Sequence, residues 1–309
     1  MGADNVLAPT RERVLAAMSE LGYSPNPAAR ALRYGATRTI GIVSHQLGRT
    51  GESRTVEAVV KAAGAEGYAV MVVDVDSPTS GVLAETANRL SSQPIDGLVI
   101  IRSEEVTPTT LSLPAGLPAV ISDSQLTGDH PVVGADHAGG SCHAVEHLLA
   151  LGHRTVHHVA GPADSGSAQL RIDGWRAALK SAGREVPPIS WGKWTAESGY
   201  EAGHRIARDP EATAVFCAND ETAAGVMRAL HEAQRMIPDD VSIIGFDDIA
   251  LAANLWPPLT TVRQDFAEIG HRLVDLLLRQ VRGAPVPDGV HEVVPVELIE
   301  RASTAPPRD

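Results

Sequence analysis

Two polar side chains stand directly after short apolar runs in the C-terminal half of the sequence. Residues 214–218 lead into Asn219, and residues 241–246 lead into Asp247. Apolar runs of this length, separated by a segment with helical spacing, are typical of buried parallel strands. In such sheets the residues that follow the strands face the crevice where ligands bind. Because an amide both donates and accepts, and a carboxylate accepts several hydrogen bonds, the pair suits a polyhydroxylated ligand.

Helix capping is the competing interpretation of these two positions. Asp220 and Asp248 come next in the sequence, and an aspartate at either position can cap the helix that follows. Since Asn219 and Asp247 each precede a residue that can do the capping, we favour ligand binding for both.

Three further polar side chains lie next to predicted strands in the N-terminal half. Asp123 ends the fourth predicted strand, and His45 and Arg49 follow the first one. The ends of parallel strands meet at one edge of a sheet, so we expect these side chains near the same crevice. His45 and Arg49 fit a solvated loop as well.

Strand-like and helix-like segments alternate along most of the chain. Apolar strand patterns are found at residues 38–44, 68–75, 97–101, 118–123, 132–136, 156–161, 214–218, 241–246 and 290–298. Strand, helix and strand at these intervals predict right-handed crossovers and doubly wound α/β sheets. Because 309 residues exceed the usual size of one core, we expect two such lobes.

One short motif suggests metal chemistry. His143, Glu146 and His147 fit the pattern H-x-x-E-H, which binds zinc in one class of peptidase. A zinc site needs a third protein ligand, and the pattern supplies two histidines. The sequence contains neither an evident nucleophile–base pair nor a phosphate-binding loop. We therefore expect no enzyme, no cofactor and no metal.

Charge is distributed unevenly along the chain. The net charge is −12, yet the first 35 residues hold four arginines against three acidic residues, which leaves −13 for the remainder. DNA repels an acidic body, so any DNA contact is expected near the N-terminus. No apolar run is long enough to span a membrane, and no apolar leader is seen. Together with two cysteines that we expect to be reduced, these features favour a cytoplasmic protein, located at the nucleoid when it binds DNA.

Several longer motifs resemble the LacI/GalR family of sugar-responsive transcriptional regulators. They are AND (218–220), SIIGFDD (242–248), PPLTTVRQDF (257–266), LRIDGW (170–175) and GKWTAESGY (192–200). The EHL and LGHR segments around His147 also match a helix–strand unit of this family. The resemblance extends over nearly the whole chain and implies two periplasmic-binding-protein-like lobes that close on a sugar. It implies effector contacts from Asp123, Arg171, Trp194, Asn219, Asp247, His45, Gln264 and Phe266.

Two of these roles are specific. The resemblance implies that Arg171 donates paired hydrogen bonds to sugar hydroxyls, for which a guanidinium is well shaped. A surface ion pair is the alternative for this arginine. It also implies that the indole of Trp194 packs against the sugar ring.

The resemblance also implies a DNA-binding part at the N-terminus. Residues 10–21 form an amphipathic pattern similar to the third helix of the family headpiece, and a hinge would follow. In the hinge a leucine is wedged into the minor groove, and the DNA-binding residues would be Asn26, Ala29, Arg30 and Leu32. A disordered linker is the alternative. The two base-reading helices would precede Asn5, so we expect residues 1–309 alone to bind operator DNA weakly or not at all.

These observations predict a domain order and a function. We expect a headpiece remnant at 1–24, a hinge at 25–37, an N-terminal lobe at 38–135 plus 266–291, a C-terminal lobe at 136–265 plus 292–303, and a tail at 304–309. The predicted function is a homodimeric repressor that a neutral mono- or disaccharide, such as a galactoside, releases from operator DNA. A periplasmic-type sugar-binding protein without a regulatory role is the alternative.

Overall fold

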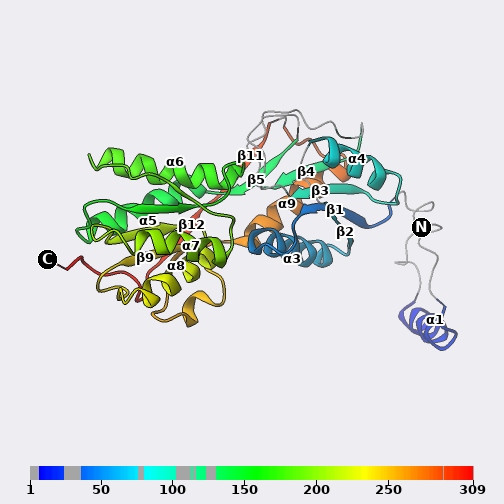
Figure 1. Ribbon diagram of the computed structural model, residues 1–309. Coiled ribbons are helices and arrows are strands. Elements are labelled where there is room, and N and C mark those ends of the chain that lie inside the picture. The colour runs from blue at the N-terminus through cyan, green and yellow to red at the C-terminus, as the bar shows by residue number, and fades with distance from the viewer. Residues whose placement is uncertain are drawn as a thin grey trace.

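The computed structural model describes residues 7–23, 36–75, 80–101, 113, 116–122, 130–287 and 289–308. Helix α1 (Ala8–Glu20) lies away from the rest of the chain, which forms two α/β lobes placed end to end (Figure 1). Five residues with predicted roles lie outside the described residues, namely Asn26, Ala29, Arg30, Leu32 and Asp123.

The N-terminal lobe is built on a parallel sheet. Among the described residues this sheet has six strands in the order β11-β5-β4-β3-β1-β2. Helices α3 and α9 cover one face and α4 the other. The elements are β1 (Thr39–His45), α3 (Thr50–Ala65), β2 (Ala69–Val75), α4 (Ser80–Ser91), β3 (Gly97–Ile101), β4 (Ala119–Ser122), β5 (Val132–Ala135), α9 (Phe266–Val281) and β11 (His291–Val294).

The C-terminal lobe repeats this architecture. Its described strands follow the order β12-β10-β9-β8-β6-β7, and all pairs are parallel except β12 with β10. Helices α5 and α6 cover one face, and α7 and α8 the other. The elements are α5 (His137–Ala150), β6 (His157–Ala160), α6 (Gly166–Ser181), β7 (Ser190–Trp191), α7 (Ala196–Ile206), β8 (Ala214–Cys217), α8 (Asp220–Glu232), β9 (Ser242–Asp247), the 3-10 helix η2 (Ala252–Asn254), β10 (Thr260–Gln264) and β12 (Val296–Ile299).

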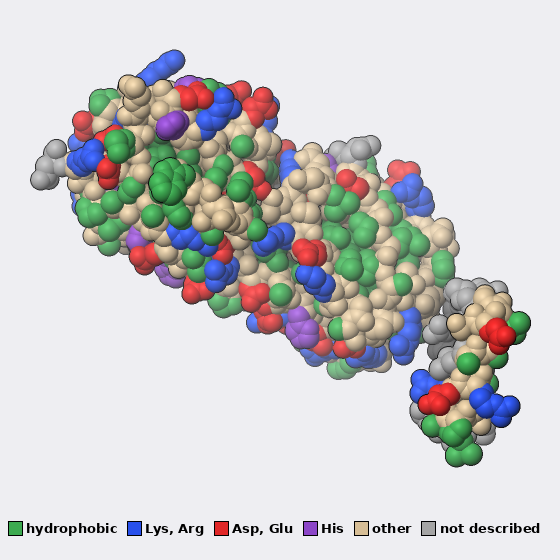
Figure 2. Space-filling model, turned by 90° about the horizontal axis from the view of Figure 1, so that it is seen from below, with side chains coloured by type: hydrophobic (Ala, Val, Ile, Leu, Met, Phe, Trp, Pro, Cys, Tyr) green, Lys and Arg blue, Asp and Glu red, His purple; other side chains and the backbone are tan. Residues whose placement is uncertain are grey.

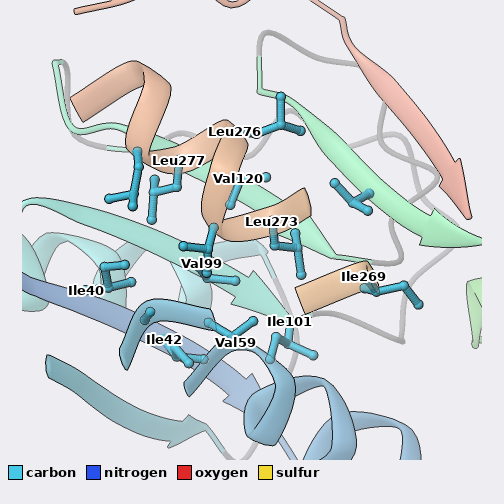
Figure 3. Packing of buried hydrophobic residues seen from close by; sticks show 14 of the residues in the cluster. Ile40, Ile42, Val59, Val99, Ile101, Val120, Ile269, Leu273, Leu276 and Leu277 are labelled. Carbon is cyan, nitrogen blue, oxygen red and sulfur yellow. The ribbon is translucent and has the colours of Figure 1, made fainter. Parts of the chain in front are cut away.

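Side chains alternate between the two faces of each strand, so the N-terminal sheet has a hydrophobic core on both faces. In β1, Ile40 and Ile42 point to the side of α3 and α9, whereas Val43 packs on the side of α4. Figure 3 shows that the apolar side of α9, which includes Leu273 and Leu277, packs over the central strands. Gly97 makes this approach possible, because a Cβ at that position would lie 2.8 Å from Cδ1 of Leu277.

The chain passes between the lobes three times. The first passage lies between β5 and α5, the second between β10 and α9, and the third between β11 and β12. The predicted strand at 290–298 is therefore two strands in two different sheets, with Pro295 between them. Proline has no N–H for the strand ladder, so pairing stops there. The third passage falls at 295, three residues after the predicted position at 292.

The two-lobed α/β prediction is confirmed. None of the helices in the described part of the chain is long and apolar enough to cross a membrane.

Candidate functional site

A cavity lies between the two lobes, and both of them supply its walls. Its empty volume is about 650 Å³, including the part that opens to solvent. Pockets for small molecules occur preferentially at such interfaces between lobes or domains. The lining residues are Arg49, Thr50, Gly51, Glu52, Thr55, Ile101, Ser122, Gly134, Phe266 and Ile269 from the N-terminal lobe and Ser167, Arg171, Trp194, Asn219, Asp247 and Gln264 from the C-terminal lobe.

Arg171 is the most constrained polar group of the cavity. Its side chain projects from α6 and is only 4% exposed. Nε donates to Nδ1 of His137 at 3.3 Å, Nη1 donates to the carbonyl oxygen of Ala218, and Nη2 donates to Oδ1 of Asp247 at 3.3 Å. A guanidinium carries five N–H groups. Two of them therefore remain for a ligand after these contacts within the described chain.

Aromatic rings enclose the same guanidinium. Cζ of Arg171 lies 3.8 Å from the ring centre of Phe246 and 5.1 Å from that of Trp194. Both distances are within the range of cation–π attraction. Trp194 adopts a positive φ of 64°, and its carbonyl accepts from Nδ2 of Asn219 at 3.0 Å. Gly161 leaves room for the indole, because a Cβ there would lie 2.5 Å from it.

Asp247 ends β9 with a positive φ of 102° and turns its carboxylate into the cavity. Oδ1 accepts from Nε2 of Gln264 at 2.6 Å and from Arg171. Burial raises the pKa of this carboxyl from 3.8 to about 6; Arg171 lowers it in part and the Glu221 carboxylate raises it. The folded protein therefore holds a carboxyl group at the cavity that ionises less readily than a solvated one.

The prediction that Asp220 caps the helix in place of Asn219 is wrong. Asn219 is itself the N-cap of α8, because it has extended backbone geometry and its Oδ1 accepts from the N–H of Thr222 at 3.0 Å. Asp220 is already helical and buried, and it accepts from Oγ1 of Thr261 at 2.5 Å and from the N–H of Ile249 at 2.8 Å. Burial and the nearby Asp247 raise the pKa of Asp220 well above its usual value. Asn219 lines the cavity even though its oxygen is occupied by the cap.

Asp248 is not a cap either. It accepts from Arg301 at 2.6 Å and from Arg263 at 2.7 Å, which ties the end of β9 to two neighbouring segments. Burial alone would raise the pKa of Asp248, but the hydrogen bonds from Arg301 and Arg263 lower it. The two adjacent aspartates thus have pKa values shifted in opposite directions.

The first turn of α3 forms the N-terminal wall. Nη1 of Arg49 lies 3.9 Å from a carboxylate oxygen of Glu52, which is buried. Thr50 donates a hydrogen bond to Glu221 at the start of α8, so the two lobes touch beside the cavity. Phe266 adds an aromatic surface where α9 begins.

The cavity brings together six of the predicted site residues, namely Arg171, Trp194, Asn219, Asp247, Gln264 and Phe266. Arg49, which was expected at the crevice, also lines it. His45 does not, because its buried Nδ1 is bonded to the carbonyl oxygen of Val75 at 2.8 Å and the ring turns away into β2. Glu52, Thr55 and Ser167 were missed. The signal available in the sequence was the position of Glu52 and Ser167 in the first turn of a helix that follows a strand, with Thr55 one turn further along α3.

The H-x-x-E-H segment lies on α5, away from the cavity. Nε2 of His147 is 3.2 Å from Oγ1 of Thr304, and Glu146 accepts from the thiol of Cys142 at 3.4 Å. No group of three metal-ligating side chains is found among the residues that the structure describes.

The fold and the cavity define the class of two-lobed α/β proteins that have a cavity between their lobes. Residues 145–304 match the family model of the periplasmic binding protein-like domain. Relatives agree: the lactose operon repressor of Escherichia coli (strain K12) is 33% identical, covering 99% of this chain and 85% of that protein. The ribose operon repressor of the same strain is 30% identical, covering 94% of this chain and 89% of that protein.

Solved structures give the same result. A crystal structure of the lac repressor bound to ONPG in the repressed state superposes with a TM-score of 0.86 at 33% identity, covering 98% of this chain and 92% of that one. The complex of the transcriptional regulator CelR with cellobiose gives a TM-score of 0.77 at 29% identity, covering 98% and 93%. The chain belongs to the LacI/GalR family of transcriptional regulators, and the relatives named here are repressors and regulators rather than enzymes.

Proposed function

We propose that this protein is a sugar-responsive repressor whose effector is a neutral mono- or disaccharide, such as a galactoside, bound between the lobes. The observation that carries the proposal is the buried Arg171, which lies between Phe246 and Trp194 and is bonded to Asp247 inside the cavity. The solved relatives that hold ONPG and cellobiose support a sugar-type ligand.

Charge balance supports a neutral ligand. Among the described lining residues, Arg49 and Arg171 are matched by Glu52 and Asp247, so no excess positive charge awaits a phosphate. Charges on buried side chains such as Glu52 and Asp247 interact strongly, and an anionic ligand would be repelled by these carboxylates. Hydroxyl groups can both donate to the carboxylates and accept from the guanidinium.

We assign roles to the lining residues on this basis. Arg171, Asp247, Asn219 and Gln264 hydrogen-bond to hydroxyls, and the faces of Trp194 and Phe266 pack on the C–H groups of the ring. Asp123 follows Ser122, a lining residue, in the sequence and stays a proposed ligand. His45 is not among the proposed ligands, because it does not line the cavity.

A panel of ligands screened by thermal shift tests the proposal. Neutral sugars, sugar phosphates and purine bases are compared at equal concentration, since a ligand that binds only the folded state raises the melting temperature by mass action. We expect at least one neutral sugar to raise it more than any phosphate or purine. A shift by the phosphates or purines alone would overturn the proposal.

Assembly and DNA binding belong to the same proposal. Large hydrophobic side chains are exposed on the C-terminal lobe, among them Trp256 (93%) and Leu251 (53%). Figure 2, seen from the side of α3 and α8, shows hydrophobic patches on both lobes. We propose that a second copy of the chain covers the exposed hydrophobic surface that includes Trp256 and Leu251. The dimer would contact operator DNA through Asn26, Ala29, Arg30 and Leu32.

A gel shift on the promoter of the gene's own operon tests this second part. Two forms are compared at matched salt, the 309-residue chain and a chain that includes whatever the genome encodes in frame upstream. We expect the longer form to bind specifically and the sugar to release it. A longer form that binds no DNA while sugar still binds would favour the periplasmic-type sugar-binding protein.

A further inference from the structure

His137 occupies a position that effector contacts alone do not explain. It is the first residue of α5 and follows directly on the first passage between the lobes. Its side chain is only 1% exposed and packs at 5.8 Å from the ring of Phe246. It does not line the cavity.

The hydrogen bond between His137 and Arg171 requires one nitrogen of the imidazole ring to be an acceptor. Nδ1 accepts from Nε of Arg171 at 3.3 Å. An imidazole nitrogen accepts a hydrogen bond only when it carries no proton, so this contact requires an unprotonated Nδ1. The Nε–H of Arg171 is thereby bonded to a residue that does not line the cavity.

The backbones on both sides of this contact are held firmly. Asp136 caps α5, since its Oδ1 accepts from the N–H of Gly139 at 2.8 Å. Helix α6 lies against the same turn, because a Cβ at Gly174 would overlap the carbonyl oxygen of Ala138. The relative position of His137 and Arg171 is therefore set by the packing of two helices, and the guanidinium retains only its side-chain rotations.

We propose that His137 is a positioning residue that sets the plane of the Arg171 guanidinium and thereby selects which sugar hydroxyls it reads. The proposal rests on the proposed function of the cavity. With Nε bonded to His137, the guanidinium presents its two terminal nitrogens to Ala218, Asp247 and the ligand. Without the imidazole, the buried Nε–H has no acceptor, which is unfavourable unless the guanidinium turns to find another one. A guanidinium that has turned would hydrogen-bond to other hydroxyl groups of the sugar.

The experiment compares three replacements of His137 with one control. His137→Ala and His137→Leu remove the acceptor, and the leucine keeps most of the volume. His137→Asn keeps an acceptor because Oδ1 can occupy the place of Nδ1. His153→Asn is the control, since His153 is equally buried but bonds to Thr213 and Ala305 instead of a cavity residue.

Calorimetry with the best sugar and an epimer of it gives the first readout. We expect His137→Ala and His137→Leu to lose about tenfold or more in affinity and to discriminate less between the two epimers. His137→Asn should restore most of both properties. The control should keep the wild-type affinity and selectivity whatever it does to stability.

A second readout needs no sugar. The imidazole nitrogen spectrum of ¹⁵N-labelled wild-type protein should show Nδ1 of His137 without a proton, and crystals of His137→Leu should show a rotated Arg171. A protonated Nδ1, an unmoved guanidinium, or equal affinities in the alanine, leucine and asparagine variants would overturn the positioning role. Failure of every sugar to bind wild-type protein would instead overturn the proposed function.

Discussion

Replacing Asp247 by Asn should stabilise the ligand-free protein at neutral pH while weakening sugar binding. The carboxyl of Asp247 is buried, and its pKa rises from 3.8 to about 6 in the folded chain. Each pKa unit corresponds to about 1.4 kcal/mol, so ionised Asp247 destabilises the fold by about 3 kcal/mol. Asparagine has nearly the same shape and no charge to bury. This trade between stability and function is common at binding sites.

The sign of the pH dependence follows from the raised pKa. Below about pH 4 the carboxyl is protonated in the folded and unfolded states, and its full contribution to stability is present. As pH rises through about 6 the folded state must ionise as well, and that contribution is lost. Wild-type stability should therefore fall by about 3 kcal/mol from this group across the interval, whereas the Asn variant lacks the fall.

Urea unfolding of both proteins at several pH values and one protein concentration measures the difference. Subtracting the two curves removes the contributions of all other groups that titrate alike. Asp248→Asn is a matched control in the adjacent position, where the hydrogen bonds from Arg301 and Arg263 lower the pKa. Its relative stability should change with the opposite sign. A difference between wild type and Asp247→Asn that is flat with pH, or that favours wild type as pH rises, would refute the reasoning.

Four further predictions follow from the same contacts. Arg171→Ala should weaken sugar binding by about 2–3 kcal/mol, because a charged hydrogen-bond donor is lost; a calorimetric change below about tenfold would exclude a direct contact. Sugar affinity of the wild type should fall as pH drops below about 6, since protonated Asp247 accepts fewer hydrogen bonds, and titrations across pH would show no such fall if the carboxyl is not a ligand. Trp256→Asp should shift the proposed homodimer towards monomer in light scattering at micromolar concentration, because a charge replaces an exposed apolar surface; unchanged mass would place the interface elsewhere. Gly97→Ala should destabilise the fold by about 1–3 kcal/mol in thermal unfolding, because its Cβ overlaps Leu277; an unchanged melting temperature would show that the helix yields.

Much of the fold could be predicted because its strands are buried on both faces. Residues 97–101 read as an apolar run and form β3 with the same bounds, and helices follow the strands at the predicted intervals. The division of residues 290–298 could not be predicted. Which sheet a strand joins depends on contacts with distant segments, and the local signal was a single proline at 295.

The candidate site was predictable in part for the same reason. Asp247 follows a buried strand, so the edge of the sheet places it in the cavity. His45 also ends a strand, but its ring is hydrogen-bonded to the carbonyl oxygen of Val75 on the neighbouring strand. The position of a residue at the end of a strand does not determine the direction of its side chain. The cap at Asn219 depends on where the helical backbone begins, which differs by one residue between the two interpretations. Glu52 and Thr55 line a cavity only because the C-terminal lobe lies opposite them, and the sequence around them does not show this.

A crystal structure of the protein with the sugar that gives the largest thermal shift would show directly whether the effector binds between the lobes. We predict one sugar per chain between the lobes, with its hydroxyls hydrogen-bonded to Arg171 and Asp247 and a C–H face of the ring against Trp194. A sugar bound elsewhere, or an empty cavity at a concentration that saturates binding in solution, would contradict it.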